Sequence, residues 1–235
     1  FRGIFLSKDL KVSPKFFLKI FRKFALGKAS LPKNGIGDLA KKMSEKVDVD
    51  ISFNHEAIKV EGNKVFFKNG KNICFDLIIF ASLPKFINEV VETKIEMDYN
   101  FNKTVYLKSS INMLDKSILL VPDDKYNINS IQCLSNISSS YSKSGEHLYS
   151  ISTIDKNVAD KTLMKEFEEI LGINTTDFQF VKSFNLKYAL PSSIITDVNL
   201  DGIHLCGDWT CEPSIDGAIK SGRILAEQLN KKAKI

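Results

Sequence analysis

The segment LCGDWTCEPSIDGAIKSG, residues 205–222, places a Gly-Asp pair between a short apolar strand and a helix. It constrains the fold because a buried strand that leads into a helix is the repeating unit of α/β sheets. Ligands of open α/β sheets bind at the carboxyl ends of strands, where Asp208 lies. Its carboxylate is suited to accept hydrogen bonds from the hydroxyls of a sugar or sugar alcohol, and Gly207 lets the backbone turn close to whatever lies above it. We therefore expect a ligand at this strand end.

The helix that follows is predicted to start at Ser214, a suitable N-cap after Pro213. Its apolar stripe recurs at helical spacing and consists of Ile215, Ala218, Ile219, Gly222, Leu225, Ala226 and Leu229. Small residues in the first turns, Gly217 among them, let a flat group or another backbone approach closely. The amides and the positive dipole end favour an electron-rich oxygen there. A plain strand–helix unit, in which Glu212 and Asp216 interact with the dipole themselves, is the alternative.

Periodicity elsewhere indicates two kinds of sheet. Residues 50–84 contain short strands joined by Gly-Asn turns, and the run Leu77–Ala81 is apolar at every position. Such a run predicts a strand buried on both faces in a parallel sheet. Residues 99–154 read as half-polar antiparallel strands, and residues 158–171 as an amphipathic helix that Gly172 ends. The expected fold class is therefore an α/β layer combined with an α+β part.

Bulk composition limits the classes of function. With 235 residues, 43% of them hydrophobic, the chain can form one large or two small domains. The net charge of +5 is too small to indicate nucleic acid binding. No apolar run reaches the ~18 residues of a membrane span, and no signal-peptide pattern is present. Four unevenly spaced cysteines favour a reducing, cytoplasmic location, and His204, Cys206 and Cys211 lack a fourth ligand for zinc.

Residues 11–28 predict a helix with one aromatic face and one basic face. The aromatic face consists of Phe16, Phe17, Ile20, Phe21 and Phe24, and the basic face of Lys15, Lys19, Arg22 and Lys23. One interpretation is peripheral contact with an anionic membrane through residues 15–24. The other is an ordinary amphipathic helix packed on its own domain, which the short length of the segment favours.

Gly35, Gly37 and Ala40 spell G-x-G-x-x-A, the pattern of a dinucleotide fingerprint. A nicotinamide-dependent dehydrogenase that used these glycines would need an apolar strand directly before Gly35. The preceding residues, GKASLPKN, are turn-forming instead. A turn followed by a helix from Asp38 to Val47 is therefore the better interpretation.

The motif LCGDWT…PSIDGAIKSGRILAEQL resembles the C-terminal flavin-binding motif of the FAD-dependent amine oxidoreductases, which include monoamine oxidases, protoporphyrinogen oxidases and phytoene desaturases. The segment ASLPKNGIGDLAKKM is similar to their Pro-Gly-Gly-Met-Gly helix start, with departures at Asn34 and Ile36. FDLIIFASLP is similar to their aD-x-VI-x-A-x-P strand, and KYALP is most similar to the desaturase-like branch. The resemblance aligns nearly the whole chain with the second half of such enzymes.

This resemblance implies FAD as the cofactor and assigns roles to residues. Gly207 and Asp208 would lie at the ribitol or pyrophosphate region of FAD. The amides around Ser214, Ile215 and Gly217 would face the N1/O2 edge of the flavin and stabilise negative charge on its reduced form. The other implied positions are Ala57 at the adenine, Ala81 and Pro84 beside the cofactor, and Tyr188, Leu190 and Pro191 near the substrate.

The resemblance also implies two domains. An FAD-binding domain would comprise residues 30–98 and 192–235, and a substrate domain residues 1–29 and 99–191. The family opens with a strand, a G-x-G-x-x-G loop and a helix that hold the pyrophosphate, and this sequence contains no such unit. We therefore expect the chain to be a fragment that lacks its N-terminal βαβ unit, binds FAD poorly and does not turn over by itself.

The implied activity of the complete protein is dehydrogenation or isomerisation of an apolar small molecule at C–C or C–N bonds, by hydride transfer to FAD. The flavin itself accepts the hydride, so the sequence indicates no particular catalytic side chain. The alternative is a protein with the flavin fold that binds a lipid-like molecule without catalysis, for which the Phe-rich segment is the support.

Overall fold

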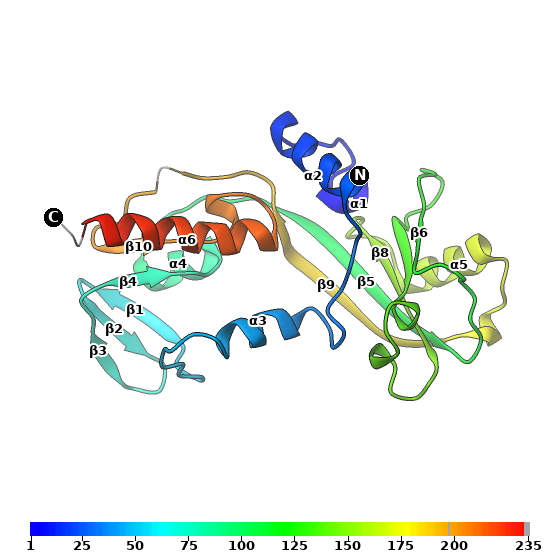
Figure 1. Ribbon diagram of the computed structural model, residues 1–235, viewed down its shortest axis with the longest axis horizontal. Helices are drawn as coiled ribbons and strands as arrows, with labels where there is room; N and C mark the ends of the chain where they lie inside the picture. Colours follow the sequence, from blue (N-terminus) through cyan, green and yellow to red (C-terminus); the bar gives the residue numbers. More distant parts are fainter. Residues whose placement is uncertain (197, 233–235) are drawn as a thin grey trace. The chain divides into compact units, whose positions relative to one another are not determined.

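The computed structural model describes residues 1–196 and 198–232 and divides the chain into two compact units (Figure 1). Unit 1 comprises Phe1–Asp48 and Asn100–Ala189, and unit 2 comprises Val49–Tyr99 and Leu190–Ile235. Residues 30–48 thus group with unit 1, whereas the expected FAD-binding domain included them. The roles assigned to the two domains stay predictions.

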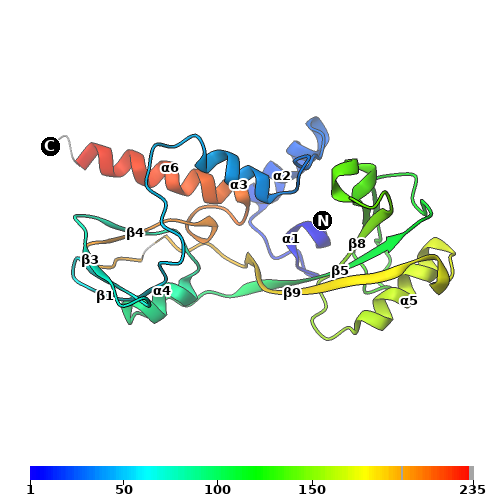
Figure 2. The same cartoon turned by 90° about the horizontal axis from the view of Figure 1, so that it is seen from below.

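Unit 1 is built on a five-stranded sheet with the strand order β6-β7-β8-β5-β9 (Figures 1 and 2). The strands are β5 (Tyr99–Ser109), β6 (Ile118–Leu120), β7 (Ser130–Cys133), β8 (His147–Thr153) and β9 (Gln179–Pro191). The pairs β6–β7, β7–β8 and β5–β8 are antiparallel. The antiparallel sheet predicted for residues 99–154 is therefore confirmed.

Helix α5 (Asp160–Leu171) closes the core of unit 1. The buried cluster includes Val105, Leu107, Ile131, Tyr149, Ile151, Leu163 and Phe167. The Phe167 ring lies 5.8 Å from the ring of Tyr149 and 5.2 Å from that of Phe178. The helix ends at Gly172, whose φ of 64° is the left-handed cap that the sequence predicts.

Shorter elements complete unit 1. They are α1 (Arg2–Phe5), α2 (Pro14–Leu26), α3 (Gly37–Ser44) and the 3-10 turns η1 (Leu134–Asn136), η2 (Ser139–Tyr141) and η3 (Thr175–Asp177). Residues 27–36, before α3, contain no strand, so the nicotinamide hypothesis lacks the element that it requires. None of the described helices combines the length and the apolar character needed to cross a bilayer.

Unit 2 contains an antiparallel sheet, β1-β2-β3, and a parallel pair, β4 and β10. Its elements are β1 (Ala57–Glu61), β2 (Lys64–Phe67), β3 (Asn72–Cys74), β4 (Ile78–Phe80), α4 (Pro84–Val91), β10 (Ile203–Leu205), η4 (Asp208–Thr210) and α6 (Ile215–Lys232). The predicted turns at Gly62 and Gly70 are present, with φ values of 58° and 85° that favour glycine. The strand–turn–strand interpretation of this region is confirmed.

The prediction that Leu77–Ala81 is buried on both faces is wrong. Ile78 is 8% exposed and packs with Ile203, whereas Leu77 and Ile79 are 45% and 46% exposed. Successive residues of a strand point to opposite faces of the sheet. Because the described residues cover one face of β4, alternate side chains remain exposed.

Candidate functional site

The parallel pairing of β4 with β10 brings two strand ends to one edge of unit 2. Phe80 lies opposite Leu205, and the amide of Cys206 donates a hydrogen bond to the Phe80 carbonyl over 3.0 Å. Ala81 and Gly207 follow these strands, so two predicted site positions from distant parts of the sequence belong to the same edge. This edge is where a parallel sheet presents its ligand-binding positions.

Trp209 joins the two strand ends, although the sequence did not predict it as a site residue. Its indole Nε1 donates to the Ser82 carbonyl over 3.1 Å, and its side chain is buried. A Cβ at position 207 would lie 2.5 Å from this Nε1, so the protein's own indole requires glycine there. Trp209 is the only tryptophan of the sequence, but its partner becomes known only once β4 and β10 are paired.

The backbone of Gly207 is fixed from both sides. Its amide donates to Ser221 Oγ over 2.9 Å, and its carbonyl accepts from Thr210 Oγ1 over 2.9 Å. Ser221 Oγ in turn donates to the Ala218 carbonyl over 2.7 Å. The loop after β10 is therefore anchored to the middle of α6 as well as to itself.

Asp208 begins η4 directly after this loop and is half-buried. Burial raises the pKa of its carboxyl group above the ordinary value of 3.8, and hydrogen bonds from the backbone amides of Trp209 and of Asp208 itself offset part of the rise. No basic side chain is among the causes of the shift. A carboxylate in these surroundings suits the acceptor role predicted for ribitol hydroxyls, and the contact itself stays a prediction.

Ser214 caps α6, as predicted. Its Oγ accepts a hydrogen bond from the Gly217 amide over 2.9 Å, and its carbonyl accepts from the Ala218 amide over 2.9 Å. The Gly217 amide is thus satisfied within the protein. Ile215 is the first residue of the helix, where an amide has no intrahelical acceptor. Among the predicted flavin-facing amides, that of Ile215 is therefore the best suited to a ligand oxygen.

The first turn of α6 is approached closely by the preceding loop. A Cβ at Gly217 would lie 1.8 Å from the carbonyl oxygen of Glu212. The expectation that another backbone segment approaches these small residues is therefore confirmed. That segment is the loop of this chain that contains Glu212. The Glu212 carboxylate meets Lys220 Nζ at 3.3 Å, so this acidic residue pairs with a cation of α6.

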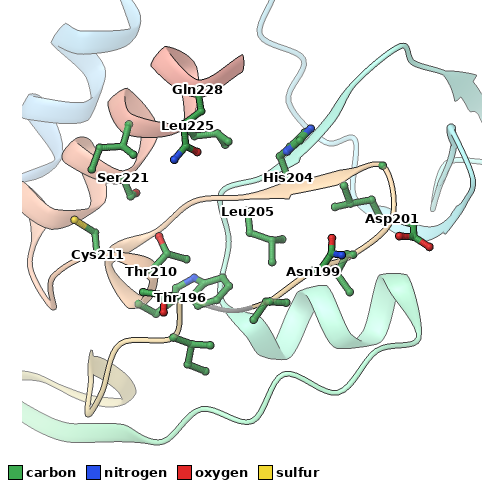
Figure 3. Close-up of a pocket in the computed structure, with 17 residues that line it drawn as sticks. Thr196, Asn199, Asp201, His204, Leu205, Thr210, Cys211, Ser221, Leu225 and Gln228 are labelled. Atoms are coloured by element: carbon green, nitrogen blue, oxygen red, sulfur yellow. The ribbon is translucent and has the colours of Figure 1, made fainter. Parts of the chain in front are cut away.

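A pocket of about 560 Å³ lies beside β10 and α6 (Figure 3). Its labelled lining residues include His204 and Leu205 from β10, Thr210 and Cys211 from the loop, and Ser221, Leu225 and Gln228 from α6. Neither Asp208 nor Ser214 nor Gly217 lines it. The pocket therefore excludes these three predicted positions, although Trp209 and Thr210, next to Asp208, line it.

The remaining predicted residues occupy several elements. Ala57 begins β1 and packs on a small buried cluster of unit 2, and Pro84 is buried at the first position of α4. Tyr188, Leu190 and Pro191 lie at the end of β9. Tyr188 belongs to unit 1, whereas Leu190 and Pro191 belong to unit 2. The cofactor and substrate roles of all five stay predictions.

Metal binding gains no support from the geometry. Within residues 1–196 and 198–232, no group of three or more His, Cys, Asp or Glu residues is placed to hold a metal ion. Cys206 and Cys211 are free cysteines, and burial raises the pKa of the Cys206 thiol.

Three solved structures share this fold over most of the chain. A putative protoporphyrinogen oxidase from Exiguobacterium sp. 255-15 is 13% identical, with a TM-score of 0.66 over 85% of this chain and 52% of that one. An oxidoreductase from Methanosarcina mazei is 13% identical, with a TM-score of 0.62 over 82% and 53%. A reduced UDP-galactopyranose mutase is 13% identical, with a TM-score of 0.53 over 73% and 45%. The chain thus spans about half the length of each of these proteins.

The family assignment comes from the sequence. No curated protein matches the chain. The model of the family described as flavin containing amine oxidoreductase matches residues 1–230, which is nearly the whole chain. The same family was indicated by the motif that runs from β10 into α6. The chain belongs to the flavin-containing amine oxidoreductases.

Proposed function

We propose that this chain forms the C-terminal half of an FAD-dependent oxidoreductase, in which unit 2 holds part of the flavin nucleotide and unit 1 belongs to the substrate domain. The proposal rests on the arrangement of residues at the edge of unit 2 where β10 ends. A half-buried carboxylate, Asp208, and the start of helix α6 follow one another there within a loop that Trp209 and Ser221 fix in place.

The residues of this edge fit one part of FAD. Asp208 supplies an acceptor for hydroxyl groups, and the amide of Ile215 at the start of α6 supplies a donor for an electron-rich oxygen. The sequence holds no glycine-rich loop after a strand to bind the pyrophosphate. The fit is therefore to the flavin side of the nucleotide, and a further segment must complete the site.

The chemistry assigned to this chain is binding and electrostatics. When bound, FAD accepts a hydride from the substrate. The positive end of the α6 dipole and the Ile215 amide would stabilise negative charge on a bound flavin. Asp208 would orient the cofactor by accepting hydrogen bonds from the cofactor's ribitol hydroxyls. The buried Trp209 keeps the two strand ends in register and excludes water between them.

The proposed reaction is dehydrogenation or isomerisation of an apolar small molecule. This part rests on the resemblance of KYALP, which ends β9, to the desaturase-like branch of the family. A lipid-like ligand bound without catalysis is the second candidate, because several large apolar side chains of α2 are exposed.

The first test is the absorbance spectrum of protein purified from the complete reading frame, beside the spectrum of the 235-residue chain. Flavin bands in the long form and none in the short form would support a site shared between two segments. A long form that stays colourless after addition of FAD would overturn the proposal. Bound FAD that no donor reduces under anaerobic conditions would favour the non-catalytic candidate.

A matched pair of variants in the long form tests the role of Asp208. Asp208→Ala is expected to lower flavin occupancy, because it removes the acceptor for the ribitol hydroxyls. Asp201→Ala changes an exposed carboxylate of the same unit and is the control. Equal flavin content in the two variants would argue against this contact.

A further inference from the structure

Helix α2 has the composition of a helix that lies at a membrane–water interface, and its side chains remain at least partly exposed to solvent. The helix runs from Pro14 to Leu26, and none of its residues is buried. At 100° per residue, its aromatic residues fall on one half of the helix and its four cations on the other. An ordinary surface helix buries its apolar half, so α2 departs from that pattern.

The two ends of α2 differ in their surroundings. At the N-terminal end, the rings of Phe16 and Phe17 lie 5.8 Å and 5.9 Å from the ring of Phe5, which is 2% exposed. Toward the C-terminal end, Phe21 and Phe24 are 49% and 54% exposed. The Phe1 ring lies 5.9 Å from the Phe21 ring and 6.3 Å from the Phe24 ring, so both ends of the helix contact α1 or the residue before it. The second half nevertheless leaves about half of its aromatic surface exposed.

The anchor of α2 is itself tied to the sheet of unit 1. Arg2 Nη1 lies 2.7 Å from Asp124 Oδ1, and Arg2 Nη2 donates to the Val121 carbonyl over 3.2 Å. Asn100 Nδ2 donates to the Phe5 carbonyl over 2.9 Å. Figure 1 shows α1 and α2 next to each other at the N-terminus. The helix α1 thus fixes the position of α2 within unit 1.

The charge of the protein is concentrated in this region. Residues 1–37 contain nine Lys and Arg side chains and one acidic side chain, Asp9, whereas the whole chain contains 33 basic and 28 acidic residues. The rest of the chain therefore carries 24 basic and 27 acidic side chains. All of the excess positive charge of the chain lies in the segment that presents the exposed aromatic residues.

We propose that the aromatic face of α2 binds an anionic lipid surface, with the helix lying in the plane of the interface. Phenylalanine and leucine side chains enter the boundary between headgroups and acyl chains, while lysine and arginine side chains meet the lipid phosphates. The helix is too short and too basic to span the bilayer, so the contact is peripheral. The proposal does not depend on flavin binding or on catalysis.

Two other occupants fit the surface less well. A second copy docked through the same face would bring two strongly basic segments together in an isologous contact. Nucleic acid would attract the cations, yet it would leave the exposed apolar surface of Phe21, Phe24 and Leu26 in water. An anionic membrane is the partner that satisfies both halves of the helix.

The test is co-sedimentation of the chain with vesicles of 70% phosphatidylcholine and 30% phosphatidylglycerol, compared with pure phosphatidylcholine. Binding to the anionic vesicles is expected at 0.1 M salt and should weaken at 0.5 M, because salt screens the charges. Absence of binding to the anionic vesicles would overturn the proposal. Equal, salt-independent binding to both vesicles would overturn the electrostatic part of it.

Two pairs of variants separate the apolar from the basic contribution. Phe21→Ser with Phe24→Ser should weaken partitioning at least tenfold, whereas Phe53→Ser with Phe86→Ser, at exposed positions of unit 2, is the control. Lys15→Gln with Arg22→Gln should weaken it about 25-fold, since each cation near an anionic surface contributes roughly fivefold. Lys116→Gln with Lys143→Gln, exposed in the same unit, is the second control.

One further measurement checks that the variants fold, and two others test the competing occupants. Circular dichroism should show that the Phe21 and Phe24 variants stay folded, because these side chains are half-exposed. A dimer in size-exclusion chromatography that the Phe variants dissociate would assign the face to a second copy. Binding to a DNA duplex that the Lys15 and Arg22 variants weaken and the Phe variants do not would assign it to nucleic acid. Either result, without vesicle binding, overturns the proposal.

Discussion

Two glycines of helix α6, Gly217 and Gly222, have opposite surroundings. A Cβ at Gly217 would lie 1.8 Å from the Glu212 carbonyl oxygen, whereas a Cβ at Gly222 would meet nothing within 4 Å. A backbone carbonyl cannot move aside as a flexible side chain can. The close approach of the loop therefore excludes any side chain at position 217, whereas the surroundings of position 222 leave room for one.

Substitution of these glycines by alanine should accordingly have opposite effects. Gly217→Ala should lower the free energy of unfolding by about 3 kcal/mol or more, through a steric clash. Gly222→Ala should raise it by about 0.5–1 kcal/mol, because alanine favours the helix and fills open space. Urea unfolding of both variants measures the difference. A similar change in both would contradict the close approach of Glu212.

Asp208 offers a prediction about pH. Burial raises its pKa in the folded state above the ordinary value of 3.8, so the folded protein binds this proton more tightly than the unfolded chain does. The stability gained from the protonated form is complete below pH 3.8 and is lost as the pH rises through the folded-state pKa. Asp208→Asn, which is never charged, should therefore stabilise the protein at pH 7 more than at pH 4.

Urea unfolding at the two pH values tests this expectation. Asp201→Asn, at an exposed position of the same unit, is the control and should show no such pH dependence. Less stabilisation at pH 7 than at pH 4 would show that Asp208 gains more from its hydrogen bonds than it loses through burial. A carboxyl group whose pKa burial raises is more common at functional sites than elsewhere in proteins.

At the scale of elements, α5 contributes a fully buried phenylalanine to the core of unit 1. Phe167→Ala should lower the free energy of unfolding by about 4 kcal/mol, because a fully buried ring is lost between Tyr149 and Phe178. Lys165→Ala, an exposed change on the same helix, should stay within about 0.5 kcal/mol of the parent. Thermal unfolding compares them, and equal losses would contradict the packing of α5 on the sheet.

The elements that the sequence predicted correctly are those with local signals. Ser214 accepts from an amide three residues away, and Gly172 ends α5 through its own left-handed conformation. The burial of β4 could not be predicted in the same way. Leu77 and Ile79 are as apolar as Ile78, and their exposure depends on which faces other segments cover. Periodicity reports what a strand can bury, and tertiary contacts decide what it does bury.

The candidate site also divides into features with local sequence signals and features that depend on tertiary contacts. The position of Gly207 and Asp208 after the end of a strand could be predicted from the sequence, because a Gly-Asp pair interrupts an apolar run. The contacts of Trp209 with Ser82 and of Gly207 with Ser221 were not, because they join residues that pattern alone cannot pair. Such partners require the pairing of β4 with β10 to be known first.

At the scale of the whole molecule, each unit has buried clusters of its own. The cluster that contains Phe167 lies in unit 1, and those that contain Ile78 and Trp209 lie in unit 2. The chain has one tryptophan, so its fluorescence reports on unit 2. Phe167→Ala should therefore shift unfolding followed by far-UV circular dichroism while the Trp209 fluorescence midpoint changes little. Identical shifts by both probes would show that the units unfold as one.

The neighbouring positions of β5 and β9 in one sheet have a consequence for how the chain folds. These strands begin and end the long stretch of unit 1 that separates β4 from β10, and the Ser192 amide donates to the Asp98 carbonyl over 2.9 Å. If this sheet forms first, it shortens the loop between β4 and β10 from 122 residues to the 29 of segments 81–98 and 192–202. The saving in loop-closure entropy is about 1 kcal/mol. Folding order would then favour the inserted sheet before the pairing of β4 with β10, so the edge of unit 2 that precedes Asp208 is assembled last.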